Sequence, residues 1–146
     1  MKRQHPNMTK LHRTLAAKER QVFEAPVFAH VATLDPDGAP QVSAVWVMLD
    51  GDDIILNTAE GRTKARNLAR DGRVAVSVTD PGDPYRNISV KGHVVQTIGE
   101  EQGAGAGINA LAKKYIGQDV YPFRADGERR VQYRVAIDAV SGWGDD

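Results

Sequence analysis

The sequence predicts a mainly β domain: an antiparallel barrel, closed or partly closed, of six short strands with helices as side elements. Segments rich in β-forming residues follow one another along most of the 146-residue chain. Clusters of Gly, Pro and Asp separate several of these segments, which is typical of turns between antiparallel strands. No strand–helix–strand repetition indicates a doubly wound parallel sheet, so a barrel of short strands is the better explanation.

The first element is predicted to be a helix over 14–25, because apolar residues recur there at helical spacing and Pro26 ends the segment. The polar residues before it, 1–13, are expected to form a flexible tail. Residues 14–146 then form a single barrel domain, which is long enough to bury one hydrophobic core.

Three strands are predicted after this helix, at 27–34, 41–49 and 54–58. The motif DPDGAP separates the first two strands, and its Asp, Pro and Gly residues favour a turn. The motif DGDD separates the second from the third and carries the Asp-Gly signature of a tight hairpin. The three strands are therefore expected to form an antiparallel meander.

Gly61 and Gly72 bracket a short helix predicted over 62–71, in which alanine and leucine recur at helical spacing. The strand that follows, 73–80, carries few charges and is expected to be buried on both faces. Residues 81–86, PGDPYR, are expected to form a loop.

A long strand is predicted over 87–98, and Gly92 inside it indicates a bulge or a bend of the barrel. The run GAGAG at 103–107 is expected to be a flexible lead-in to a helix over 108–116. The last strand, 130–143, alternates cleanly between apolar and polar residues, which completes the six strands.

The charges of the whole chain are balanced, with 19 Lys and Arg against 19 Asp and Glu. A general nucleic-acid-binding protein would usually be basic, so that class is not expected. No apolar run is long enough to cross a membrane, and the N-terminus lacks the apolar region of a secretory signal. Without cysteine, neither disulfides nor a thiol nucleophile is available. These properties predict a cytoplasmic protein.

One segment departs from this balance, because residues 58–73 hold five basic side chains and two acidic ones. The segment leads from a predicted strand to a helix N-terminus, where free N–H groups and the helix dipole favour an anion. Arg62 and Lys64 lie in the first turn, from which they can close over a phosphate. The alternative is a solvated helix face, with Glu60 and Asp71 as local partners.

No other group of residues indicates catalysis, and no catalytic residue is assigned. His30 and His93 each stand alone in a predicted strand and are expected to be structural, and no cluster has metal-ligand spacing. There is no Gly-x-Ser-x-Gly motif, so covalent catalysis is unsupported. Trp46 either packs in the core or borders a planar ligand. An anion site without catalytic residues favours chemistry supplied by a cofactor.

Two motifs, NTAEGRTKARNLARDGRVAVSVTD (57–80) and LAKKYIGQDVYPF (111–123), resemble a known family. The chain is similar over about 23–140 to the pyridoxamine-phosphate-oxidase-like split-barrel superfamily. More narrowly, it resembles the flavin/deazaflavin oxidoreductases of the B group, which are common in actinobacteria and many of which use coenzyme F420. The resemblance implies a six-stranded split barrel that forms a homodimer, with two cofactor sites at the dimer interface.

Carried over by position, the resemblance implies that the cofactor-binding residues are Val45, Trp46, Asn57, Thr58, Arg62, Thr63, Lys64 and Asn87. Arg62 and Lys64 would hold the phosphate, in agreement with the reading of the basic segment. The strand that contains Val45 and Trp46 would run along the ring system, mostly through backbone contacts. Asn87 would reach the cofactor from the partner subunit.

One departure from the superfamily pattern bears on the choice of cofactor. Flavin-binding oxidases of the superfamily usually carry basic residues on the second strand, where this chain has Val42 and Val47. FMN would lose those charged contacts, so F420 is the expected cofactor and FMN the alternative. Arg66 and Arg70, further along the helix, are candidates to meet the polyglutamate tail of F420.

The resemblance therefore implies an F420-dependent reductase that transfers a hydride from the reduced deazaflavin to a small organic substrate. The alternatives are an FMN-dependent oxidoreductase of the same fold, a non-catalytic F420 or flavin carrier, and, less favoured, a haem-binding module. A pyridoxal-phosphate-forming oxidase is disfavoured by the valines on the second strand. Tyr85, Tyr115 or water would supply the proton. Residues 81–86 and 100–123 would shape the substrate pocket.

Overall fold

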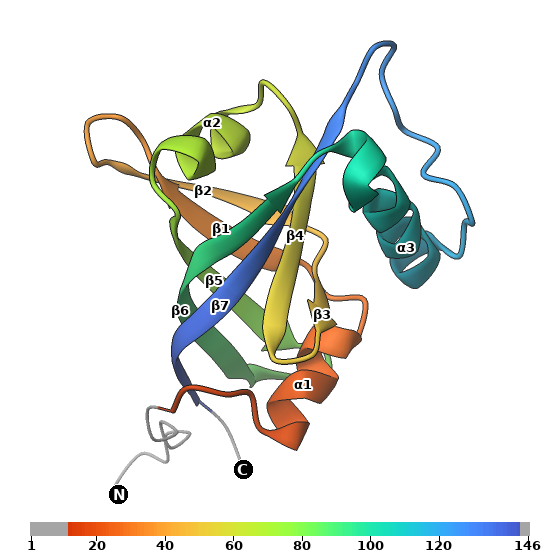
Figure 1. Cartoon of the computed structure of the whole chain (residues 1–146). Helices are drawn as coiled ribbons and strands as arrows, with labels where there is room; N and C mark the ends of the chain where they lie inside the picture. Colours follow the sequence, from red (N-terminus) through yellow and green to blue (C-terminus); the bar gives the residue numbers. More distant parts are fainter. Residues whose placement is uncertain (1–11, 144–146) are drawn as a thin grey trace, which may run out of the picture.

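Seven strands form one antiparallel sheet in the computed structural model, which describes residues 12–143 (Figure 1). In chain order the elements are α1 (Ala17–Glu24), β1 (Ala29–Leu34), β2 (Pro40–Val45), β3 (Met48–Asp50), β4 (Asp53–Ala59), α2 (Thr63–Arg70), β5 (Arg73–Asp80), β6 (Asp83–Ile98), the π-helix η1 (Glu100–Ala104), α3 (Gly105–Ile116) and β7 (Arg130–Trp143). The mainly β class is confirmed, with one strand more than expected.

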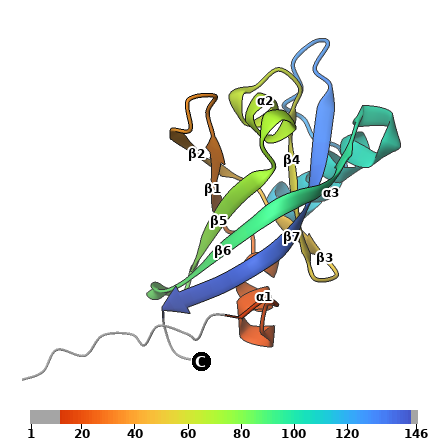
Figure 2. The same ribbon diagram turned by 60° about the vertical axis from the view of Figure 1, so that its left-hand side comes forward.

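The strands follow the order β2-β1-β5-β6-β7-β4-β3, and each pairs antiparallel with its neighbours. The sheet curls on itself, and the long strands β6 and β7 sweep across the barrel (Figure 2). Its two edge strands, β2 and β3, are consecutive in the chain. The gap between these edges, here called the seam, is therefore crossed by the chain itself at Trp46 and Val47.

The prediction of one strand over 41–49 is wrong, because the chain turns from one edge of the sheet to the other at Trp46 and Val47. Side chains of α3 replace the missing ladder partners there. Tyr115 Oη accepts a hydrogen bond from Val47 N at 3.0 Å, and Lys114 Nζ donates to Val47 O at 2.6 Å. Lys114 also donates to Phe23 O at 2.6 Å, which ties α3 to the end of α1.

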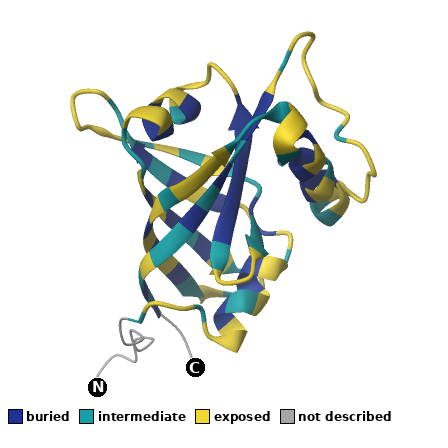
Figure 3. Cartoon of the chain, in the orientation of Figure 1, coloured by how far each residue is buried: buried dark blue, intermediate teal, exposed yellow. Residues whose placement is uncertain are grey.

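Apolar side chains fill the inside of the curled sheet, and strand burial alternates along most strands (Figure 3). Strand β5 follows this alternation, with Val74, Val76 and Val78 buried, so the expectation that it is buried on both faces is wrong. Strand β4 is the one buried almost throughout. The reason is that η1 and α3 pack on the outer side of β4 and β7, where Asn57 Nδ2 donates to Ala104 O at 2.9 Å.

The GAGAG run is a packed junction rather than a flexible lead-in. It spans the end of η1 and the start of α3, which begins three residues earlier than predicted. Gly103 has φ of 142°, a conformation that favours glycine. Gly105 and Gly107 are buried, and a Cβ on Gly107 would overlap Gln132 Oε1. The glycines therefore let the helix approach the sheet closely.

Strand β6 differs from the expectation at its start and agrees with it in the middle. Only Pro81 and Gly82 form a turn, because the strand already begins at Asp83. The predicted bulge is confirmed, since the register to β7 shifts between Lys91 and Gly92. A Cβ on Gly92 would overlap the carbonyl oxygen of Ala136, so this crossing requires glycine.

The expected tail, 1–13, lies outside the described residues except for its last two. His12 exchanges backbone hydrogen bonds with Val140 of β7, and its Nε2 lies 2.7 Å from Glu19 Oε1. None of the helices in the described part of the chain is long and apolar enough to cross a membrane.

Candidate functional site

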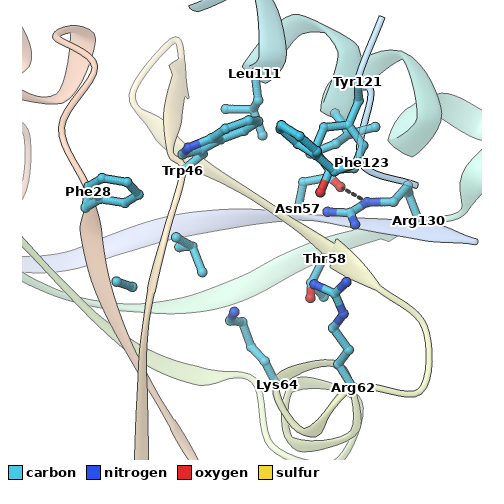
Figure 4. A pocket seen from close by; sticks show the side chains of 13 residues that line it. Phe28, Trp46, Asn57, Thr58, Arg62, Lys64, Leu111, Tyr121, Phe123 and Arg130 are labelled. Carbon is cyan, nitrogen blue, oxygen red and sulfur yellow. Dashed lines mark hydrogen bonds between the residues drawn. The ribbon is translucent and has the colours of Figure 1, made fainter. Parts of the chain in front are cut away.

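A hollow of about 210 Å³ opens where the seam meets the end of β4 and the start of α2 (Figure 4). Helix α3 and the segment 117–129 after it close one side. The lining side chains are Phe28, Ala44, Val45, Trp46, Asn57, Thr58, Arg62, Lys64, Ile108, Leu111, Tyr121, Phe123 and Arg130. The hollow thus gathers residues from segments far apart in the sequence.

One wall of the hollow is aromatic. The ring of Trp46 stacks on Tyr115 at 5.1 Å between centroids and meets Tyr121 edge-on at 5.9 Å. Tyr121 in turn meets Phe123 edge-on at 5.7 Å. Trp46 is half-buried and lies outside the hydrophobic core, so the expectation of core packing is wrong, and its ring lines the hollow. A planar apolar group can lie against this wall.

Three cationic side chains also line the hollow: Arg62 and Lys64 lie across it from the aromatic wall, and Arg130 lies beside Tyr121 (Figure 4). Burial, followed by the charges of Arg62 and Arg130, lowers the pKa of Lys64 to about 8. No carboxylate among the described residues pairs with the Lys64 ammonium. No side chain caps the N-terminus of α2, whose first N–H groups lie beside these cations. An anion here would relieve the repulsion among the cations.

Sequence reasoning missed Arg130, which is 3% exposed. Its Nε donates to Asn57 Oδ1 at 2.9 Å, and its guanidinium lies over the Tyr121 ring, 5.3 Å from the centroid. In the sequence, the one indication of this role was that the last predicted strand begins with a basic residue. Only the pairing of β7 with β4 brings that start beside the end of β4.

Asn57 lines the hollow, but its side chain is fully engaged. Its amide donates to Ala104 O at 2.9 Å and to Gln132 Oε1 at 3.0 Å, while its oxygen accepts from Arg130. Each donor hydrogen therefore has a partner. Asn57 therefore orients Arg130 and joins η1 to the sheet at the wall of the hollow.

The structure brings six of the eight expected cofactor-binding residues to one hollow and leaves two elsewhere in this chain. Thr63 is exposed, and its hydroxyl accepts from Arg66 at 3.5 Å. Asn87 lies on β6, paired in register with Thr79 and Trp143, and does not line the hollow. Of the segments expected to shape the pocket, 100–123 contributes lining residues and 81–86 contributes none.

Four other residues whose identity bears on the expected cofactor or proton donor also lie outside the lining. Val42 is 63% exposed, whereas Val47 is fully buried in the core. The Tyr115 hydroxyl donates to Val27 O, so a structural contact already uses its proton. Arg70 donates to Leu34 O at 2.6 Å and holds the end of β1.

Among the described residues, no His, Cys or Met side chain that could ligate a metal or haem iron lines the hollow. Within residues 12–143, no group of three His, Cys, Asp or Glu side chains is placed to hold a metal ion. The two strand histidines lie elsewhere, and His93 Nδ1 is 2.9 Å from Asp138 Oδ2.

The lowered pKa of Lys64 predicts that anion affinity depends on pH. A bound anion stabilises the ammonium and raises its pKa, so affinity is highest below pH 8 and falls as the amine loses its proton above pH 8. We expect sulfate, whose charge is constant in this range, to bind roughly 5- to 10-fold more weakly at pH 9.5 than at pH 7. NMR titration with sulfate at each pH measures the two dissociation constants.

The Lys64→Arg variant is the matched control, because arginine stays charged throughout this pH range. Its sulfate affinity should be nearly constant from pH 7 to 9.5. An unchanged fall in that variant would show that another group titrates.

Comparison with known proteins places this chain in a family. The sequence model of the pyridoxamine 5'-phosphate oxidase family matches residues 15–144. No curated protein matches the chain.

Among solved structures, an F420 reductase is 34% identical, with a TM-score of 0.76, over 86% of this chain and 98% of that one. A conserved hypothetical protein from Mycobacterium tuberculosis is 24% identical, with a TM-score of 0.71, over 93% of this chain and 90% of that one. A heme binding protein from Mycobacterium smegmatis is 25% identical, with a TM-score of 0.58, over 83% of this chain and 50% of that one.

The family match covers nearly the whole described chain, and the strand order agrees with a curled barrel that is open at one seam. The relative that is 34% identical is an F420 reductase with the same fold. The chain therefore belongs to the pyridoxamine 5'-phosphate oxidase-like split-barrel family of flavin- and deazaflavin-type oxidoreductases.

Proposed function

We propose that this protein is an F420-dependent reductase that transfers a hydride from reduced F420 to a small organic substrate. The observation that carries the proposal is the hollow itself, which combines an aromatic wall with three cations, one of them an amine without a carboxylate partner among residues 12–143. The similarity to an F420 reductase over 86% of the chain favours the deazaflavin.

The residues of the hollow fit the two chemical parts of such a cofactor. Arg62, Lys64 and Arg130 would hold the phosphate through charge-assisted hydrogen bonds. The end of β2 and the Trp46 ring would orient the planar ring system. When bound, the deazaflavin supplies the hydride chemistry, and the chain's contribution is to position the ring and substrate and to exclude water.

We also propose that the protein works as a homodimer, because one chain does not enclose the site. The hollow of about 210 Å³ is smaller than the roughly 300–1,000 Å³ of typical small-molecule pockets. A second, mostly apolar hollow of about 500 Å³ lies on the outer face of the sheet, bordered by Ala32, Ala75 and Ala139. A partner seated against such small side chains could bring its Asn87 to the cofactor.

Binding titrations of the purified protein with F420 and FMN side by side test the proposal. We expect F420 to bind more tightly and its reduced form to be reoxidised by a member of an acceptor panel. Light scattering during size-exclusion chromatography should report a dimer.

Each competing function gives a different result in these experiments. Tighter FMN binding, with absorption near 450 nm, would indicate an FMN-dependent oxidoreductase. Tight F420 binding without turnover of any acceptor would indicate a carrier. A haem absorption band that grows during titration with haem would support the haem-binding alternative, although no histidine among the described residues lines the hollow. A clean monomer would contradict the shared site.

A further inference from the structure

One carboxylate bridges the two arginines of the hollow. The Glu128 side chain is 7% exposed and stands two residues before β7. Its Oε1 accepts from Arg62 Nη2 at 3.3 Å, and its Oε2 accepts from Arg130 Nη1 at 3.2 Å. Glu128 therefore holds one ion pair with each arginine, whereas Lys64 has no carboxylate partner among the described residues.

The two arginines are held very differently. Arg130 is 3% exposed and is fixed by Asn57 as well as by Glu128. The Arg62 side chain is 56% exposed, and Glu128 is its one hydrogen-bonding partner among the described side chains. Arg62 can therefore turn toward a ligand at little cost, whereas Arg130 cannot leave its partners without breaking buried contacts.

We propose that Glu128 is an internal counter-anion that Arg62 exchanges for the phosphate of the ligand, and that this carboxylate biases the site toward phosphodiesters. The inference rests on the proposed function, which places a phosphate at these cations. A carboxylate beside the phosphate repels it, and the Coulomb energy is proportional to the ligand charge. The penalty for a phosphomonoester dianion is therefore about twice that for a phosphodiester monoanion.

This bias acts on the two cofactors that the fold can hold. FMN carries a phosphomonoester, which is a dianion above about pH 6, whereas F420 carries a phosphodiester. Glu128 therefore weakens FMN binding more than F420 binding. A carboxylate that only positioned the arginines would have the opposite effect, because its removal would weaken both ligands.

The Glu128→Gln variant tests the proposal, since it removes the charge and keeps the shape. At pH 7.5 we expect F420 to bind roughly 3-fold more tightly and FMN roughly 10-fold more tightly than to the wild type. Riboflavin, which lacks the phosphate, should be unchanged. Fluorescence titration gives the three dissociation constants, and circular dichroism checks the fold.

The Glu101→Gln variant is the matched control, because Glu101 is exposed and pairs with Arg129 outside the lining. It changes the net charge equally and should leave all three affinities unchanged. A gain of the same size in this control would reject a local effect of Glu128.

The outcomes separate this inference from the proposed function. Binding of F420 or FMN to the wild type, with unchanged or weaker binding to Glu128→Gln, would overturn the inference alone. Binding of neither ligand to the wild type would overturn both. Arg62→Gln gives a second test if Glu128→Gln does not fold. It should weaken the binding of F420 and of FMN and leave the binding of riboflavin unchanged. Unchanged F420 and FMN affinities would refute the exchange.

Discussion

Replacing Arg62 and Lys64 together by alanine is expected to reduce F420 affinity more than any other change on the surface of this protein. Each lost charge-assisted contact contributes roughly 1.5–3 kcal/mol, so the pair should cost about 3–6 kcal/mol in binding free energy. Folding should change little, because neither side chain belongs to the hydrophobic core. Fluorescence titration for binding and thermal unfolding for stability measure the two effects separately.

The Lys113→Ala variant controls for a general loss of positive charge. Lys113 is exposed on α3 and pairs with Asp119 outside the lining, so its loss should leave the affinity within about twofold of the wild type. If the double variant bound F420 as tightly as the wild type, the phosphate would have to lie elsewhere.

Replacing Arg130 by methionine is expected to weaken both the fold and the site. The side chain is 3% exposed, and its removal leaves Asn57 Oδ1 and Glu128 Oε2 without their donor. Breaking a buried contact of this kind should lower the free energy of unfolding by about 2–4 kcal/mol. F420 affinity should fall as well, because one of the three cations is gone. Urea denaturation and ligand titration measure the two losses.

The neighbouring Arg129→Met variant is the matched control. Arg129 is half exposed and pairs with Glu101 and Glu60 at the surface, where ion pairs contribute less than about 1 kcal/mol. Its stability and affinity should stay close to those of the wild type. Equal destabilisation by the two substitutions would mean that the buried contacts of Arg130 contribute no more to stability than the surface ion pairs of Arg129.

The sequence was sufficient to predict the elements whose signals are local. Turn residues identified the hairpin at Gly51, which has φ of 60°, and Gly92 identified the bulge of β6. The basic segment predicted the short helix and its two site cations, because a strand–turn–helix path and the residue types both lie within one stretch of chain. Each of these features can be predicted without knowing which distant segments pack against it.

The features that the sequence could not predict depend on contacts between distant segments. The break at Trp46 and Val47 lies inside an apolar run with good β propensity, and it exists because Lys114 and Tyr115 satisfy the backbone of Val47 from another element. Arg130 enters the site only through the register of β7 against β4. No local pattern carries that information.

The covalent crossing of the seam also fixes a dimension of the molecule. Three peptide units join Val45, the last residue of one edge strand, to Met48, the first of the other, and such a link spans at most about 11 Å. So short a linker is already near full extension at that distance and cannot stretch. The end of β2 and the start of β3 therefore cannot move further apart than this when a molecule enters the hollow, because the linker between them has a fixed maximum length.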